Sequence, residues 1–151
     1  MLRQAFTDRL KQALKAGDAR ALSTTRLILA GLKDRDIAAR GQGNAEGISE
    51  TEIQRMLQAM IKQRRESIAL YEQGNRADLA QREREEIALI ESFLPRQLEE
   101  SEIEAAVKTL IAETGAAGMK DMGRIMAALR ERHAGIIDFG RASAIVRLLL
   151  G

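Results

Sequence analysis

The stretch Phe93-Leu94-Pro95-Arg96-Gln97-Leu98 contains the single proline among 151 residues. Proline has no backbone N–H, and its ring disfavours a helical conformation at the residue before it. Apolar residues recur at helical spacing on both sides of this stretch, which indicates helices throughout the chain. We therefore predict that Pro95 joins two helical domains.

Four helices are expected in the N-terminal domain, residues 1–94. Gly17 can end the first helix and Asp18 can cap the second, because glycine adopts left-handed conformations and aspartate accepts hydrogen bonds from free helix N–H groups. Gly74 and Asn75 separate the third and fourth helices, with Asn75 as the predicted cap of the fourth. So short a connection predicts an antiparallel helical hairpin.

The third helix has its own start signal. Gly41–Gly47 holds three glycines, so we expect a mobile loop with little to bury. Ser49 and Glu52 then have the spacing of a capping box, in which each side chain accepts from the other residue's backbone N–H.

The C-terminal domain, residues 95–151, is expected to contain three helices, the last of them capped by Asp138. No alternating apolar pattern of strand length occurs in the chain. The predicted fold class is therefore all-α: a four-helix domain followed by a small three-helix tail domain.

The composition excludes several classes of protein. With 45% apolar and 30% charged residues, the chain is expected to fold. It has no cysteine, which excludes disulfides and thiolate metal sites. No apolar run approaches the roughly 18 residues of a membrane span, and the N-terminus lacks the apolar core of a signal peptide. We therefore predict a cytoplasmic location and no membrane partner.

No group of residues is typical of an active site. His133, the one histidine, stands near a predicted helix end, where a cation suits the helix dipole. No nucleophile or orienting carboxylate is recognisable beside it. Glu83, Glu85 and Glu86 are close in sequence, but solvated helix carboxylates are far commoner than metal sites. We predict no catalytic residue, no cofactor and no metal.

Basic residues carry the functional prediction. Between residues 120 and 147, six basic residues stand against three acidic ones, while the net charge of the chain is only +2. Arg26 and Lys33, seven residues apart, likewise share a face of the second helix. Solvated helix faces are the ordinary explanation, and contact with RNA phosphates is the functional one. The predicted RNA-binding residues are Lys120, Arg124, Arg132, Arg141 and Arg147.

Arg64 differs from these cations, because helical spacing places it inside the apolar arc of the third helix. Glu83 lies in the apolar arc of the fourth helix in the same way. A lone buried charge is costly and a paired one is tolerated. Because the two residues are ten and nine positions from Gly74, we predict a structural ion pair between them.

Three segments resemble, in their order, the GatB/YqeY family in its YqeY-like branch. They are Lys62-Gln63-Arg64-Arg65-Glu66-Ser67, Phe93-Leu94-Pro95-Arg96-Gln97-Leu98 and Asp121-Met122-Gly123-Arg124-Ile125-Met126. The likeness covers nearly the whole chain. The part from about Pro95 onward resembles the helical tail domain of the B subunit of the tRNA-dependent amidotransferase, in which the tail grips tRNA.

The resemblance implies tRNA as a partner, with an aminoacyl-tRNA synthetase or an amidotransferase as a further candidate. It also implies the label of a carbon–nitrogen ligase with glutamine as amido donor, although the chemistry of the larger enzyme lies in domains that match nothing here. After Gly135 the family usually has a basic residue, and this chain has Ile136. That difference removes one candidate phosphate contact.

The leading hypothesis is a non-catalytic tRNA-binding accessory protein. One alternative is a helical protein-interaction module. The other is participation in amide transfer, within a complex that supplies the chemistry.

Overall fold

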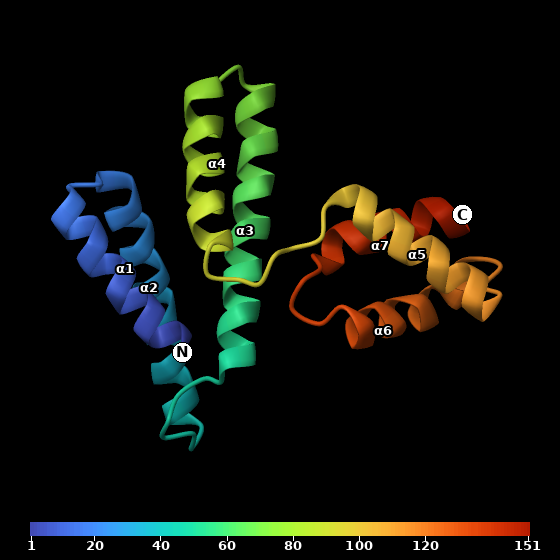
Figure 1. Cartoon of the computed structure of the whole chain (residues 1–151), viewed down its shortest axis with the longest axis horizontal. Coiled ribbons are helices and arrows are strands. Elements are labelled where there is room, and N and C mark those ends of the chain that lie inside the picture. Colours follow the sequence, from blue (N-terminus) through green and yellow to red (C-terminus); the bar gives the residue numbers. More distant parts are fainter. The chain divides into compact units, whose positions relative to one another are not determined.

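The computed structural model describes residues 1–151, and all of its regular structure is helical (Figure 1). The elements are α1 (Leu2–Ala16), α2 (Ala19–Gly41), α3 (Glu50–Gln73), α4 (Ala77–Glu91), α5 (Glu100–Thr114), the 3-10 helix η1 (Met119–Asp121), α6 (Met122–Arg132) and α7 (Phe139–Leu150). The predicted all-α class is confirmed. The helices gather into two compact units, Met1–Leu94 and Pro95–Gly151. That each unit folds by itself as a domain stays a prediction.

The first unit consists of two antiparallel hairpins, α1–α2 and α3–α4 (Figure 1). Gly17 closes α1 in the left-handed conformation with φ +65°. Asp18 caps α2, since its carboxylate accepts a hydrogen bond from the Ala21 N–H at 3.0 Å. The predicted boundary between these helices is therefore confirmed, and α2 goes on to pack against α3 and α4.

The second hairpin begins and turns with clear local signals. Ser49 and Glu52 form the predicted capping box of α3, each side chain accepting from the other's N–H. Gly74 ends α3, but Asn75 does not cap α4. It adopts a left-handed conformation with φ 57°, and Arg76 holds the cap position without a side-chain cap. Asparagine tolerates that conformation better than most residues, so it serves the turn rather than the helix start.

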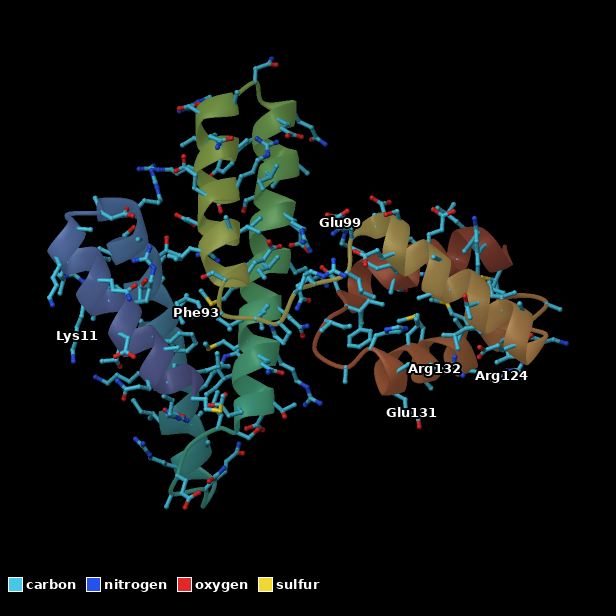
Figure 2. All side chains as sticks on the ribbon, viewed as in Figure 1. Lys11, Phe93, Glu99, Arg124, Glu131 and Arg132 are labelled. Carbon is cyan, nitrogen blue, oxygen red and sulfur yellow. The ribbon has the colours of Figure 1, made fainter.

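The core of the first unit draws on all four helices and on the segment that follows α4. Phe6, Ile28, Ile53 and Ile90 have 0% exposure. The rings of Phe6 and Phe93 meet edge to face, with centroids 4.8 Å apart, and Figure 2 labels Phe93 beyond the end of α4. An edge-to-face aromatic pair adds about 0.5–1.5 kcal/mol beyond the area that it buries. Through this contact, Phe93 packs the segment after α4 against α1.

Pro95 lies outside every helix, between the end of α4 at Glu91 and the start of α5 at Glu100. Arg96 then donates two hydrogen bonds to Glu102, at 2.9 and 2.8 Å. The same carboxylate accepts from the Glu99 N–H at the start of α5. These donors lower the pKa of Glu102 to about 2, and they order the chain directly after the proline.

The second unit has a core of its own, in which α7 packs against both α5 and α6. Ile103, Ile125 and Ile137 are fully buried in it. Asp138 caps α7 as predicted, accepting from the N–H groups of Gly140 and Arg141. Ile136 accepts a hydrogen bond from the Leu98 N–H through its carbonyl, at 2.7 Å.

Candidate nucleic-acid interface

The five predicted RNA-binding side chains lie on three elements of the second unit. Lys120 is in η1, Arg124 and Arg132 are in α6, and Arg141 and Arg147 are in α7. Figure 2 labels Arg124 and Arg132 along α6. The side chains of Arg124, Arg132 and Arg141 are 53%, 51% and 38% exposed, and Lys120 and Arg147 are exposed. All five are therefore within reach of a ligand in solvent.

Three of these five cations already contact carboxylates. Arg124 lies 3.1 Å from Asp121, Arg132 lies 2.7 Å from Glu113, and Arg141 lies 3.7 Å from Glu100. Exposed ion pairs of this kind contribute about 0–1 kcal/mol, so an incoming phosphate can replace the carboxylate at small cost. Lys120 and Arg147 form no ion pair.

The second unit as a whole carries no net charge. The predicted excess covered residues 120–147 alone, whereas the whole unit from Pro95 to Gly151 has eight basic and eight acidic residues. Most of the compensating carboxylates stand on or just before α5, which packs against α7 and α6. The sequence gives this count, but only the packing of the helices shows which carboxylates of α5 lie beside the cations.

Two further basic residues of this unit have structural surroundings. The Arg130 guanidinium lies 5.4 Å from the centre of the Phe139 ring, within the range of a cation–π contact. His133 is the C-cap of α6, and the helix dipole favours positive charge at that end of a helix. This position fits the structural role expected for His133 at a helix end.

In the first unit, Arg64 joins α3 to α4, with a partner that differs from the predicted one. Its Nε donates to Glu86 at 2.9 Å, while Glu83 lies 4.0 Å away. The predicted pair thus exists at the limit of ion-pair distance, and Glu86 holds the hydrogen bond. Glu83 and Glu86 are three residues apart and flank the same turn of α4. Counting residues from Gly74 therefore could not decide which of them pairs with Arg64.

The carboxylates around Arg64 also contact α2. Arg20 lies 3.5 Å from Glu85 and 3.8 Å from Glu86. Burial raises the pKa of Glu83, and the nearby charge of Glu86 raises it further, against the opposing effect of Arg64. The group therefore ties three helices together. No cluster of three metal-ligating side chains occurs in the structure.

A second charged pair, Arg3 with Asp36, was missed in the sequence. The Arg3 guanidinium donates to both Asp36 oxygens, at 2.5 and 2.9 Å, and to the Ile48 carbonyl at 2.9 Å. Asp36 also accepts from the Ile48 N–H at 2.9 Å. A signal was available, because Asp36 follows the buried Leu32 by four residues on the same side of α2.

The Arg3–Asp36 pair also holds the end of the loop before α3. Gly47 is buried against Asp36, and its neighbour Ile48 is held by the bonds just described. The end of the segment predicted to be mobile is thus tied to α1 and α2.

None of the helices combines the length and apolar character needed to cross a membrane.

The sequence of this chain is similar to those of known proteins. The sequence model of the Yqey-like protein family matches residues 3–150. The "Altered inheritance of mitochondria protein 41, mitochondrial" of Lachancea thermotolerans is 34% identical over 106 residues, which are 69% of this chain and 54% of that relative. The protein of the same name in Vanderwaltozyma polyspora is 30% identical over 120 residues, covering 75% of this chain and 62% of the relative. The match therefore spans less than two thirds of either relative.

The names of both relatives describe mitochondrial proteins. They contradict the cytoplasmic location predicted from the sequence, and that prediction is wrong. Composition reports on folding and on membrane spans, and it does not say which compartment holds a chain.

The family match extends through both compact units and includes Arg64, Pro95 and Arg124. The predicted family is thereby confirmed, while the likeness of the tail to the amidotransferase B subunit stays a prediction. This chain belongs to the Yqey-like protein family.

Proposed function

We propose that this protein is a non-catalytic accessory protein that binds tRNA through the phosphate backbone. The observation that carries the proposal is the set of five solvent-accessible cations on η1, α6 and α7. Phosphate contacts supply most of the affinity in sequence-independent RNA and DNA binding. The resemblance of this unit to a tRNA-gripping tail supports tRNA as the RNA.

The chemistry of the surface favours modest, backbone-directed binding. The chain has three Phe, one Tyr and no Trp, and Phe6 is fully buried. Stacking platforms for unpaired bases need exposed aromatic rings. Recognition would therefore rest on the shape of a folded RNA and on its phosphates.

The experiment is a salt series with bulk tRNA and the full chain. With three to five phosphate contacts, log affinity should fall against log salt with a slope of roughly −2 to −4. The test variant is Lys120→Gln/Arg147→Gln, because neither side chain is needed for an ion pair within the protein. Its slope should be flatter than that of the wild type by about 1.5. Equal slopes would remove these two residues from the interface, and an absence of wild-type binding at low salt would refute RNA binding.

A helical protein-interaction module is the second candidate. Leu148 and Leu149 are consecutive in α7 and are 82% and 36% exposed, and exposed apolar side chains beside one another mark protein contacts. Crosslinking in cells separates the candidates. Enriched tRNA supports the first, whereas a protein partner that is lost in Leu148→Ser supports the second.

Participation in amide transfer stays a prediction from the family resemblance. Glutamine-dependent amidation assays with and without this chain test it, and equal rates would exclude it.

A further inference from the structure

The most basic part of the protein is the α1–α2 hairpin rather than the tail. Residues 1–41 contain nine basic and four acidic side chains, an excess of five, whereas the whole chain has a net charge of +2. The rest of the chain is therefore acidic overall. Charge concentrated in this way on one pair of helices is an electrostatic footprint for a polyanion.

Most of these cations are not used within the fold. Arg3 is held by Asp36, and Arg20 lies near Glu85 and Glu86. Arg40 donates a hydrogen bond to the Ala45 carbonyl at 3.2 Å, and its charge helps to lower the pKa of Asp36. The others form no ion pair. Six of the basic side chains are exposed: Lys11, Lys15, Arg26, Lys33, Arg35 and Arg40. Figure 2 shows Lys11 projecting from α1 on the side away from α4.

Five of these cations form two rows, and Arg35 lies outside both. Arg26, Lys33 and Arg40 recur every seven residues on α2, which places them in one row at intervals of about 10 Å. Lys11 and Lys15 are one turn apart on α1. Since Arg3 contacts Asp36, α1 runs antiparallel to α2 in a fixed register that brings Lys11 to the level of the α2 turns around Arg26. Helical spacing then sets both rows on the solvent side of the seam between α1 and α2.

The spacing selects the kind of anion. Cations about 10 Å apart along a rigid helix cannot converge on a single phosphate or carboxylate, but they can follow a chain of phosphates. Between the cations of α2, Ala30 is exposed and small, whereas Ile37 is apolar and 56% exposed. Asp8 is the carboxylate nearest this surface on α1, and it accepts a hydrogen bond from Gln4 at 2.8 Å.

We propose that this outward face of the α1–α2 hairpin, with Lys11, Lys15, Arg26, Lys33 and Arg40, is a second binding surface for the phosphate backbone of a folded RNA. The inference rests on the proposed function for the class of ligand, and it assigns binding to residues in a different compact unit. Contact would be electrostatic, with serine and glutamine side chains available as added donors to phosphate oxygens.

The test compares the full-length wild type with three double variants of equal charge loss, using fluorescently labelled bulk tRNA over a salt series. Arg26→Gln/Lys33→Gln probes the hairpin face and Lys120→Gln/Arg147→Gln probes the tail. Arg55→Gln/Lys62→Gln is the matched control, because both residues are exposed on α3. All four positions on α2 and α3 are solvated helix sites, and circular dichroism checks that each variant folds.

The hairpin variant should bind with a salt slope flatter than that of the wild type by about 1.5, while the control variant keeps the wild-type slope. A hairpin slope equal to the wild type overturns this inference, and a flattened tail slope in the same experiment leaves the proposed tail site standing. A flattened hairpin slope with an unchanged tail slope supports the inference and removes the tail residues. If the control flattens as much as the hairpin variant, net charge rather than this face decides the binding, and the inference fails.

Two competitors test the class of partner. Poly-L-glutamate in charge excess should displace tRNA poorly, because its carboxylates lack the fixed geometry of a folded RNA. Displacement as effective as that by unlabelled tRNA would assign the face to acidic protein. Vesicles of phosphatidylcholine and phosphatidylserine should not sediment the protein, and sedimentation that depends on Arg26 and Lys33 would assign the face to a membrane surface.

Discussion

Arg3 of α1 and Asp36 of α2 form a bidentate ion pair whose two hydrogen bonds measure 2.5 and 2.9 Å. The Asp36 side chain is 8% exposed and that of Arg3 is 39% exposed. The pair therefore joins the start of the chain to the end of α2 at a site that is closed to water on the carboxylate side. Through Ile48, it also holds the segment that leads into α3.

Replacing Asp36 by Asn should lower the free energy of unfolding by about 2–4 kcal/mol, because Arg3 and the Ile48 N–H lose a charged acceptor in a buried position. Urea denaturation measures the change. Asp34→Asn is the matched control, since Asp34 is exposed on the same helix, and it should change stability by less than about 0.5 kcal/mol. Equal effects of the two variants would show that the Arg3–Asp36 pair does not contribute.

The same pair should make stability depend on pH in the acid range. Hydrogen bonds from Arg3 lower the pKa of Asp36 from 3.8 to about 2. A carboxylate with a lowered folded pKa stabilises the fold above its unfolded pKa, and that contribution is lost as pH falls toward the folded value. The stability difference between wild type and Asp36→Asn should thus be about 1 kcal/mol smaller at pH 3 than at pH 6. A difference that stays constant over this range would contradict the lowered pKa.

Gly47 should resist substitution more strongly than Gly43. Both have positive φ, at 86° and 95°, but a Cβ on Gly47 would lie 2.3 Å from the Asp36 carboxylate, and a Cβ on Gly43 meets nothing within 4 Å. Gly43→Ala should cost about 1–2 kcal/mol from the left-handed conformation alone. Gly47→Ala should cost at least about 2 kcal/mol more than that, because it also displaces Asp36 from Arg3. Thermal and urea unfolding of the two variants decide this, and equal losses would refute the close approach.

Glu83 and Glu86 should respond in opposite ways to neutralisation. Glu86 accepts the Arg64 hydrogen bond at 2.9 Å, so Glu86→Gln should destabilise the fold by about 1–3 kcal/mol. Burial and the charge of Glu86 raise the pKa of Glu83, which means that its ionised form costs stability above that pKa. Glu83→Gln at pH 7 should therefore leave the free energy of unfolding unchanged or increase it. A greater loss in Glu83→Gln than in Glu86→Gln would reverse the assignment of the partner.

The second unit should be more stable as a fragment when the residues directly after Pro95 are included. Gln97 donates to the Gly135 carbonyl at 2.8 Å, and the Leu98 N–H donates to Ile136 at 2.7 Å. A fragment of residues 95–151 should show helical circular dichroism and a cooperative melt, whereas residues 99–151 should melt at lower temperature because these bonds are missing. An unfolded 95–151 fragment would show that the tail is not an independent domain.

The sequence alone determined the features that depend on neighbours along the chain. Glycine at Gly17, the carboxylates of Asp18 and Asp138, and the capping box of Ser49 with Glu52 are local signals, since each interaction closes within about three or four residues. The same holds for the all-α class, which follows from apolar spacing, and for the break at Pro95. Asn75 was an exception, because a turn and a cap use the same residue types and the backbone of the turn decides between them.

Only the tertiary structure decided which charges meet. Two pairings depend on the register of packed helices. Arg3 meets Asp36, 33 residues away in the sequence, and Arg64 meets Glu86, 22 residues away, in preference to Glu83. The same packing decides that carboxylates of α5 lie beside two of the predicted RNA-binding cations, while seven of the nine cations of the α1–α2 hairpin form no ion pair. A sequence states how many charges there are, but the electrostatic energy depends on the distances between them and on their exposure to water, and those are set by the fold.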